Sequence, residues 1–255
     1  MSYKTEELMI AVIARLLEDP AVRHVTVGAA SPVPGSAALL VQHLTNGRLR
    51  TSIIHGLADN PFTDGGRETF DCAGQGRIDV FFLGGVQIDG EANINLVGTG
   101  NYPQVDKRFP GSFGSAFMYF VVPKVILFRP EHTRRVCVPK VEFISAPGTS
   151  EPGVSRPGGP KALVTELCLM SFDAGRKRFQ LESVHPGHTL EEVLDNTGFE
   201  FDIPETVPVT AEPEPERLAL LRSGIGEKIA EIYPDFVARV FGEAALGKHK
   251  REDAA

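Results

Sequence analysis

The stretch from residue 77 to residue 116 contains the residues whose types and spacing best suit a binding or catalytic site. Residues 80–83 form a continuous apolar run, which predicts a strand that is covered on both faces. Gly84 and Gly85 follow at its carboxyl end, where a backbone without side chains can approach a ligand and present its N–H groups. Ligands of open α/β sheets bind at this edge. A tight turn would explain one glycine pair equally well, so the prediction of a site needs a second feature.

The second feature is a glycine-rich loop, residues 110–116, which is followed by a run compatible with a helix. Gly111, Ser112 and Gly114 lie in this loop. They are candidate binding residues, because backbone N–H groups at the start of a helix attract an anionic group. Close packing of a helix is the alternative reason for these glycines.

A predicted tight turn lies between the two glycine segments and contains Glu91, Asn93 and Asn95. Asparagine side chains stabilise such turns by bonding to nearby backbone groups, which is the role we expect for both. Contact with a substrate is the alternative for Asn93. We expect Glu91 to be a solvated turn residue.

The composition is that of an ordinary globular protein and argues against two classes of partner. The chain has 255 residues, is 42% hydrophobic and 23% charged, and carries a net charge of −7. Nucleic acids are bound by clustered Lys and Arg, which are scattered here, so no nucleic-acid partner is expected. No apolar stretch approaches the roughly 20 residues of a membrane helix, and the first residues do not resemble a signal peptide. We therefore expect no membrane partner.

The three cysteines, Cys72, Cys137 and Cys168, are odd in number and far apart in the chain. Their spacing matches no metal-binding motif, so no metal site is predicted. A reducing, cytoplasmic setting is the simplest interpretation. Cys72 has no evident partner base and is not expected to act as a nucleophile.

Helical and strand patterns alternate in the first part of the chain. Thr5 is a predicted N-cap, apolar residues follow it at helical spacing, and the helix should end near Pro20. Further elements are predicted as a strand at 25–28, a helix at 35–44 and a strand at 49–54. The loop at 57–67 follows a strand's carboxyl end and is expected to line the site.

The later part of the chain predicts shorter elements and a change of organisation near its end. These elements are a helix or strand at 118–122, strands at 125–128, 136–138 and 141–144, an exposed Pro/Gly loop at 150–159, a hairpin from 163–172 and 179–184, and a short helix capped by Thr189. We expect one domain at residues 1–206, a Pro/Glu-rich linker at 207–216, a helical region at 217–247 and a frayed tail at 248–255. Strands interleaved with helices predict an α/β fold with an open, mostly parallel sheet and an appended hairpin region.

Several short motifs follow one another in a fixed order: FLGGVQID at 82–89, ANIN at 92–95, PGSFGSA at 110–116, SAPG at 145–148 and HPG at 185–187. Together they resemble the signature of the β-subunits of family I CoA-transferases, which include the glutaconate, 3-oxoacid and acetate types. The resemblance covers most of the chain. Ordered motifs at matching separations are far more specific than one glycine pair.

The resemblance implies an open α/β fold of the CoA-transferase (NagB/RpiA-like) type and a heteromer with an α-subunit of similar size. It implies acyl-CoA chemistry where the two subunits meet, with coenzyme A as a co-substrate and no bound cofactor. In that family a glutamate in a Glu-x-Gly motif of the β-subunit forms a covalent thioester with CoA. By the same resemblance Gly84 offers its N–H to the thioester oxyanion.

The sequence departs from the family at the nucleophile. Its matching segment is SIIHG at 52–56, and Ile54 stands where the glutamate is expected. Isoleucine cannot form an acyl adduct. The family also has a branch without this glutamate: heteromeric hydrolases that open rings of steroid-derived CoA thioesters with water. The chain resembles that branch in its missing carboxylate.

His55 lies beside the vacant position, and as a neutral imidazole it is a candidate general base for water. A polar residue that closes a strand is the alternative interpretation. Asp59, Asp64 and Glu68 follow in the next loop, where each is either a substitute carboxylate or a solvated acid.

Three functions remain in play. The first is a β-subunit that takes part in CoA transfer to or from a carboxylic acid, with any nucleophile supplied by the α-subunit. The second is hydrolysis of a CoA-linked substrate by activated water, at a thioester or at a carbon–carbon bond. The third is a subunit without catalytic residues that completes the pocket of its partner.

Overall fold

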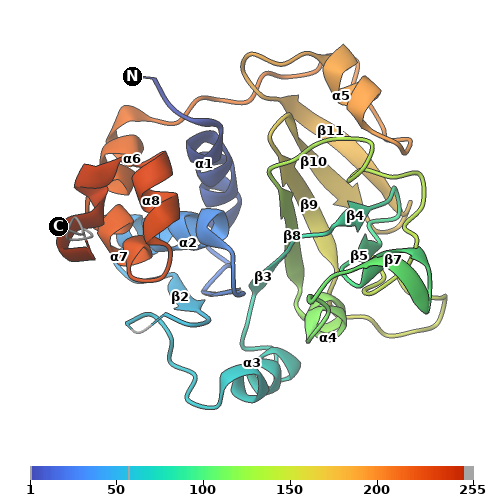
Figure 1. Cartoon of the computed structure of the whole chain (residues 1–255), viewed down its shortest axis with the longest axis horizontal. Coiled ribbons are helices and arrows are strands. Elements are labelled where there is room, and N and C mark those ends of the chain that lie inside the picture. The colour runs from blue at the N-terminus through green and yellow to red at the C-terminus, as the bar shows by residue number, and fades with distance from the viewer. Residues whose placement is uncertain (1, 57, 250–255) are drawn as a thin grey trace. The chain divides into compact units, whose positions relative to one another are not determined.

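The computed structural model describes residues 2–56 and 58–249, whose contacts separate into two compact units (Figure 1). One unit combines residues 1–63 with 212–255, and the other consists of residues 64–211. The described segments before residue 64 and after residue 211 therefore belong to the same unit. Most of the predicted tail at 248–255 lies outside the described residues.

The first unit contains two parallel strands and helices from both ends of the chain. Strands β1 (His24–Val27) and β2 (Arg50–Ile53) pair in parallel, with Val25 opposite Thr51. The helices before residue 63 are α1 (Thr5–Leu17) and α2 (Pro32–Leu44). The later elements are α6 (Pro215–Leu220), the π-helical turn η1 (Leu221–Ile225), α7 (Gly226–Ala230), α8 (Pro234–Val240) and the 3₁₀ segment η2 (Glu243–His249).

Two predicted helix starts in this unit need correction. The N-cap of α1 is Lys4 and not Thr5, because the carboxylate of Glu7 accepts the Lys4 backbone N–H at 2.9 Å and supplies the capping bond. Helix α2 begins at Pro32, three residues before the predicted start, since proline fits the first turn of a helix. The strand predictions are confirmed to within one residue at each end.

A buried ion pair joins the two ends of the chain within this unit. Glu7 of α1 is fully buried, and both of its carboxylate oxygens accept hydrogen bonds of 2.7 Å from Arg222 of η1. Removal of the guanidinium would leave a buried carboxylate without its cation. We expect Arg222→Ala to lower the free energy of unfolding by about 3–5 kcal/mol in urea denaturation.

The matched control is Arg239→Ala, which removes an exposed guanidinium paired with Glu6 in the same unit. Exposed ion pairs contribute about 0–1 kcal/mol, so the control should change stability little. Equal effects of the two substitutions would contradict the assigned importance of the Glu7–Arg222 pair.

The second unit is built on a mixed sheet with the strand order β11-β10-β9-β8-β3 (Figure 1). Strands β3 (Val80–Leu83), β8 (Lys124–Arg129) and β9 (Pro160–Thr165) are mutually parallel. Strands β10 (Cys168–Asp173) and β11 (Arg178–Val184) continue the sheet as an antiparallel hairpin. Every residue of β3 is buried, as its unbroken apolar run predicts. The predicted α/β fold with a mostly parallel sheet and an appended hairpin is confirmed.

Shorter elements complete this unit. They are the helices α3 (Gly65–Gly74), α4 (Ser115–Val121) and α5 (Leu190–Asn196), the strand pair β4 (Gln87–Ile88) and β5 (Ile94–Asn95), and the strand pair β6 (Gly98–Asn101) and β7 (Gln104–Arg108). Thr189 caps α5 as predicted, because its hydroxyl accepts the backbone N–H of Glu192 at 3.1 Å. Helix α3 starts inside the segment predicted to be a loop.

The predicted strands at 136–138 and 141–144 are wrong. Residues 136–138 make a single bridge, between Cys137 and Ile88, and no ladder. The N–H groups of Val141 and Glu142 donate to side-chain oxygens of Asp89 and Gln87 instead of a neighbouring strand. Side-chain oxygens thus accept the hydrogen bonds that the carbonyl groups of a neighbouring strand would otherwise have accepted.

Candidate active site

The backbone turns at the end of β3, and its two glycines are in different environments. Leu83 pairs with Leu127, so Gly84 lies beside Phe128 of β8. A Cβ atom at Gly84 would lie 3.4 Å from the Phe128 carbonyl oxygen, a tight but possible contact. A Cβ atom at Gly85 would lie 2.7 Å from the carbonyl oxygen of Gln87, closer than real Cβ atoms come. Packing therefore requires glycine at 85, whereas it does not explain Gly84, which is half-buried.

The carboxylate of Asp89 organises the turn that follows, which the sequence analysis did not predict. It accepts the backbone N–H of Glu91 at 3.1 Å, that of Asn93 at 3.0 Å and that of Val141 at 3.3 Å. The Asn93 side chain donates to Asp89 at 3.2 Å and accepts the Gly148 N–H at 3.0 Å. Asn93 is buried, and both polar ends of its side chain bond within this unit, which favours the turn-shaping role.

Asn95 is fully buried and also bonds within the unit. Its amide donates to Gln87 Oε1 at 2.8 Å and to the Gly98 carbonyl oxygen at 2.7 Å, and its Oδ1 accepts the Val97 N–H at 3.0 Å. Gln87 in turn donates to Glu142 at 2.8 Å. Gln87 and Glu142 are thus part of a polar chain beside Gly85 that the sequence reasoning missed, because 55 residues separate them in the chain.

The second glycine loop lies against the segment that carries these asparagines. The nearest atoms to a Cβ atom at Gly111 belong to Leu96, at 3.8–3.9 Å, so packing does not require this glycine. The Ser112 carbonyl oxygen accepts the Ser115 N–H at 2.9 Å, where α4 begins. At Gly114 a Cβ atom would lie 2.1 Å from the ring of Phe70, so close packing accounts for that glycine. Helix α4 has only seven residues.

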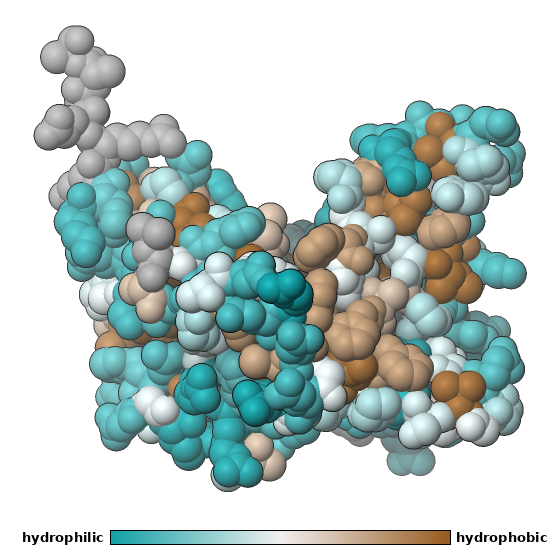
Figure 2. Space-filling view, turned by 90° about the horizontal axis from the view of Figure 1, so that it is seen from below, coloured by the Kyte–Doolittle hydropathy of each residue, from teal (hydrophilic) through white to brown (hydrophobic). Residues whose placement is uncertain are grey.

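An aromatic cluster stands beside this loop. The ring centroid of Phe70 lies 5.4 Å from that of Phe113 and 5.8 Å from that of Phe117. Phe113 is 89% exposed and Phe117 42%. Figure 2, which views the molecule from the side where Figure 1 places α3 and α4, shows hydrophobic residues at the surface among hydrophilic ones. The loop that carries Gly111 and Ser112 therefore has exposed apolar neighbours.

Ile54, where the sequence predicts that the family's nucleophile is missing, belongs to the first unit. Ile54 directly follows β2, is half-buried and donates its N–H to the Val27 carbonyl oxygen at 3.0 Å. His55 is exposed and has a φ of +75°, which a residue other than glycine rarely adopts. Gly56 closes the turn by donating its N–H to the Ile53 carbonyl oxygen at 3.0 Å. A strained backbone, costing about 1–3 kcal/mol, thus holds an exposed imidazole at the carboxyl end of a strand.

The three candidate acids of the following loop are divided between the two units. Asp64 pairs with Arg67, and Glu68 accepts the Asp64 N–H at 2.9 Å, at the start of α3 in the second unit. Asp59 remains in the first unit, where its carbonyl oxygen accepts the Ile53 N–H at 2.8 Å. Cys72 is half-buried in α3. Over residues 2–56 and 58–249 no three His, Cys, Asp or Glu side chains are grouped as metal ligands would be.

Two buried histidines of the second unit are structural. His185, from the HPG motif, has Nδ1 2.8 Å from the Thr210 hydroxyl and Nε2 3.0 Å from the Thr165 carbonyl oxygen. His132 lies between the hydroxyls of Thr165 and Thr197, at 2.7 and 2.9 Å. The pKa of each imidazole is lowered to about 4, chiefly by burial, and the nearby His185 contributes to the lowering at His132. Both rings are therefore neutral at pH 7.

These lowered pKa values predict a loss of stability in acid. Above pH 6.5 the rings are neutral in both the folded and the unfolded chain, and the full stability is present. As the pH falls from 6.5 to about 4, only the unfolded chain gains the protons, and each histidine then costs about 3 kcal/mol. We expect His185→Gln to reduce the drop in unfolding free energy between about pH 7.5 and 4.5 by about 2–3 kcal/mol. His43→Gln, at an exposed position of α2, is the control, and an undiminished drop in His185→Gln would refute the assignment.

Comparison with known proteins agrees with the order of motifs. The sequence model of the family described as Coenzyme A transferase matches residues 7–196. The chain is 32% identical over 244 residues to the B-type subunit of 3-oxoadipate CoA-transferase from Pseudomonas knackmussii, covering 87% of this chain and 93% of that protein. It is 31% identical over 160 residues to the cholesterol ring-cleaving hydrolase IpdB subunit of Rhodococcus jostii, covering 61% of this chain and 62% of that protein.

Among solved structures, IpdAB of Rhodococcus jostii RHA1 superposes with a TM-score of 0.77 at 25% identity, covering 87% of this chain and 94% of that one. The family match spans well over half of the chain, and the relative from Pseudomonas knackmussii is similar over almost its whole length. The resemblance predicted from the motifs is confirmed. This chain belongs to the coenzyme A transferase family, and its relatives there are subunits of the B type.

Proposed function

We propose that this chain is the β-subunit of a heteromer that acts on the carbonyl carbon of an acyl-CoA thioester. An α-subunit completes the site, and coenzyme A enters as part of the substrate. The B-type names of its relatives and the paired name of IpdAB support the need for a partner. A cytoplasmic setting is supported by the three free cysteines. No helix in the described residues is long and apolar enough to cross a bilayer.

The reaction that we propose is hydrolysis, and the observation that carries it is Ile54. This residue follows β2, and by the resemblance of its segment to the family motif it takes the predicted place of the glutamate. Its side chain cannot form the acyl or CoA adduct that transfer requires. The next residue, His55, is exposed on a strained backbone. Its imidazole takes a proton from water while the water oxygen attacks the carbonyl carbon. The tetrahedral intermediate then breaks its C–S bond, and the imidazolium gives the proton to the departing CoA thiolate, so that the acid and free coenzyme A are released.

By resemblance to the family, we assign the binding and polarisation of the acyl-CoA substrate to residues of the second unit. Gly84 donates its N–H to the developing oxyanion. We assign this role because packing does not explain why residue 84 is a glycine. Gly85 supports it by permitting the close turn. Gly111 and Ser112 contact the substrate or CoA, with Gly114 placing their loop against Phe70. Asn93 contributes by fixing the turn and not by contact.

The second candidate function is CoA transfer with a nucleophile from the α-subunit. The similarity to the B-type subunit of 3-oxoadipate CoA-transferase, over 93% of that protein, favours it. The two functions differ in what attacks the thioester, which isotope and trapping experiments separate.

The test uses the heteromer and an acyl-CoA in ¹⁸O-water without an acceptor acid. We expect ¹⁸O in the released acid and no adduct on this chain after treatment with hydroxylamine or borohydride. Ile54→Glu is the matched control, because a restored carboxylate should give a trappable adduct and prove that the trap works. An adduct on the unmodified chain, or turnover only when an acceptor acid is present, would overturn hydrolysis.

A further inference from the structure

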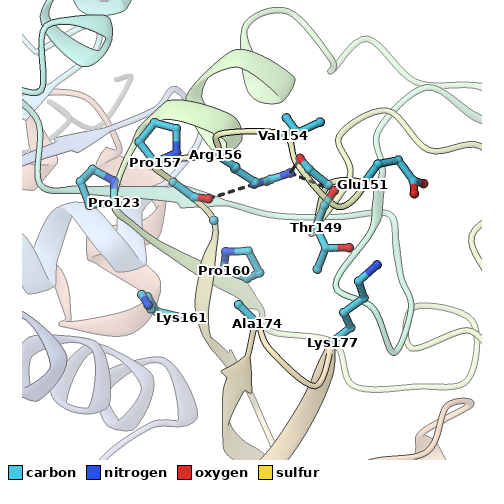
Figure 3. Close-up of a pocket in the computed structure, with 14 residues that line it drawn as sticks. Pro123, Thr149, Glu151, Val154, Arg156, Pro157, Pro160, Lys161, Ala174 and Lys177 are labelled. Carbon is cyan, nitrogen blue, oxygen red and sulfur yellow. Dashed lines mark hydrogen bonds between the residues drawn. The ribbon is translucent and has the colours of Figure 1, made fainter.

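A pocket lies in the unit formed by residues 64–211, at the opposite end of its parallel strands from Gly84. It has a volume of about 290 Å³, and its lining includes Pro123, Thr149, Glu151, Arg156, Lys161 and Lys177 (Figure 3). Pro123 precedes β8, whereas Gly84 lies beside Phe128 near the end of that strand. About five residues of strand separate the two points by roughly 16 Å. The pocket is therefore distinct from the Gly84 corner.

Arg156 forms a fixed cation at this pocket. Its five N–H groups donate to the carbonyl oxygens of Tyr119, Pro147, Thr149 and Gly158 and to the Ser150 hydroxyl, at 2.8–3.3 Å. All of these acceptors are neutral, and no carboxylate of the described residues pairs with the guanidinium. Partial burial lowers the pKa of Arg156, as expected for a charge without a counterion. The guanidinium thus adds positive potential that no ion pair within residues 2–56 and 58–249 neutralises.

Two lysines add to this positive charge. Lys161 is at the start of β9 and Lys177 in the turn between β10 and β11, and both are exposed. Neither forms an ion pair within residues 2–56 and 58–249. Glu151 is the acid in the lining, and Figure 3 shows its carboxylate directed away from Arg156. Three cations and one acid therefore line the pocket, although the chain as a whole carries a net charge of −7.

The wall between these cations is stiff. Pro123, Pro157 and Pro160 lie in it, and proline has a fixed φ. The N–H groups of Gly158 and Gly159 donate to Phe120 and Val122, which hold this segment against the end of α4. A ligand would therefore find the pocket largely formed, with little ordering cost beyond two lysine side chains.

We propose that this pocket binds a small phosphate-bearing ligand, with Lys161 and Lys177 as its direct contacts and Arg156 as a fixed background charge. Phosphate carries up to two negative charges, and a lysine ammonium binds it as a compact point charge with three donors. A volume of about 290 Å³ admits a phosphate monoester with a small organic part. The site shares no residue with the proposed hydrolysis.

The test measures binding to the full chain by calorimetry, with inorganic phosphate and glycerol 2-phosphate as probes at constant ionic strength. We expect saturable binding of at least one probe, weakened about tenfold or more by Lys161→Ala and by Lys177→Ala. Lys140→Ala is the matched control, since it removes an exposed lysine of the same unit away from the pocket and should leave the affinity unchanged.

The two probes distinguish an organic phosphate from inorganic phosphate as the ligand of this pocket. Tighter binding of the ester identifies an organic phosphate, and equal binding identifies inorganic phosphate; both support the site. No saturable binding, or the same weakening in all three lysine variants, would overturn it. Because the readout is binding and not turnover, this result is independent of the outcome of the hydrolysis experiment.

Discussion

Replacing His55 with asparagine is expected to lower kcat of the heteromer by about 10²- to 10⁴-fold, the contribution of a general base. Asparagine tolerates the left-handed backbone that His55 adopts at φ +75°, so the turn after β2 should persist. The amide cannot take a proton from water. Steady-state hydrolysis of an acyl-CoA, together with the melting temperature of the variant, measures both consequences.

A glycine substitution at the same position tests whether the backbone of residue 55 is strained. A histidine held in a strained conformation costs the fold about 1–3 kcal/mol, so His55→Gly should be as stable as the parent chain or more stable while being equally inactive. His43→Asn, at an exposed position of α2, is the control and should retain full activity. An active His55→Asn heteromer would remove the imidazole from the mechanism and leave the α-subunit to supply the base.

Replacing Gly148 with alanine is expected to destabilise the second unit by about 3 kcal/mol or more. A Cβ atom at this position would lie 2.2 Å from the Glu91 carbonyl oxygen and 2.7 Å from the carbonyl carbon of Ala92. These are backbone atoms of the turn held by Asp89, so they cannot rotate aside. The shift needed would also stretch the 3.0 Å bond from the Gly148 N–H to Asn93. Urea denaturation of the purified chain measures the change in unfolding free energy.

Gly111→Ala is the matched control within the same unit. The nearest atoms to a Cβ atom there are 3.8–3.9 Å away, an ordinary contact, so stability should change by less than about 1 kcal/mol. Similar stabilities of the two variants would mean that the turn at residues 89–93 yields easily. A stable Gly111→Ala variant with weakened substrate binding would support its place in the proposed site.

The sequence predicted most of the sheet and missed several elements for identifiable reasons. Residues 80–83 form a strand because an unbroken apolar run needs cover on both faces, and that pattern is local. Residues 141–144 are also apolar in part, yet they form no strand, because Asp89 and Gln87 take their N–H groups. Helix α3 begins with two glycines in a polar segment, so its packing through Phe70 is what identifies it.

The family of the chain followed from the sequence alone, because the order of motifs depends only on which residues follow one another. The vacancy at Ile54 is a prediction of the same kind, since it rests on the absence of a carboxylate from one motif. The tertiary structure decided which contacts each residue makes. It showed that close packing requires glycine at positions 85 and 148 but does not require it at position 84. It also gave Arg156 its neutral partners, the farthest of them 37 residues away in the chain. Such contacts depend on segments distant in sequence, whose approach only the fold determines.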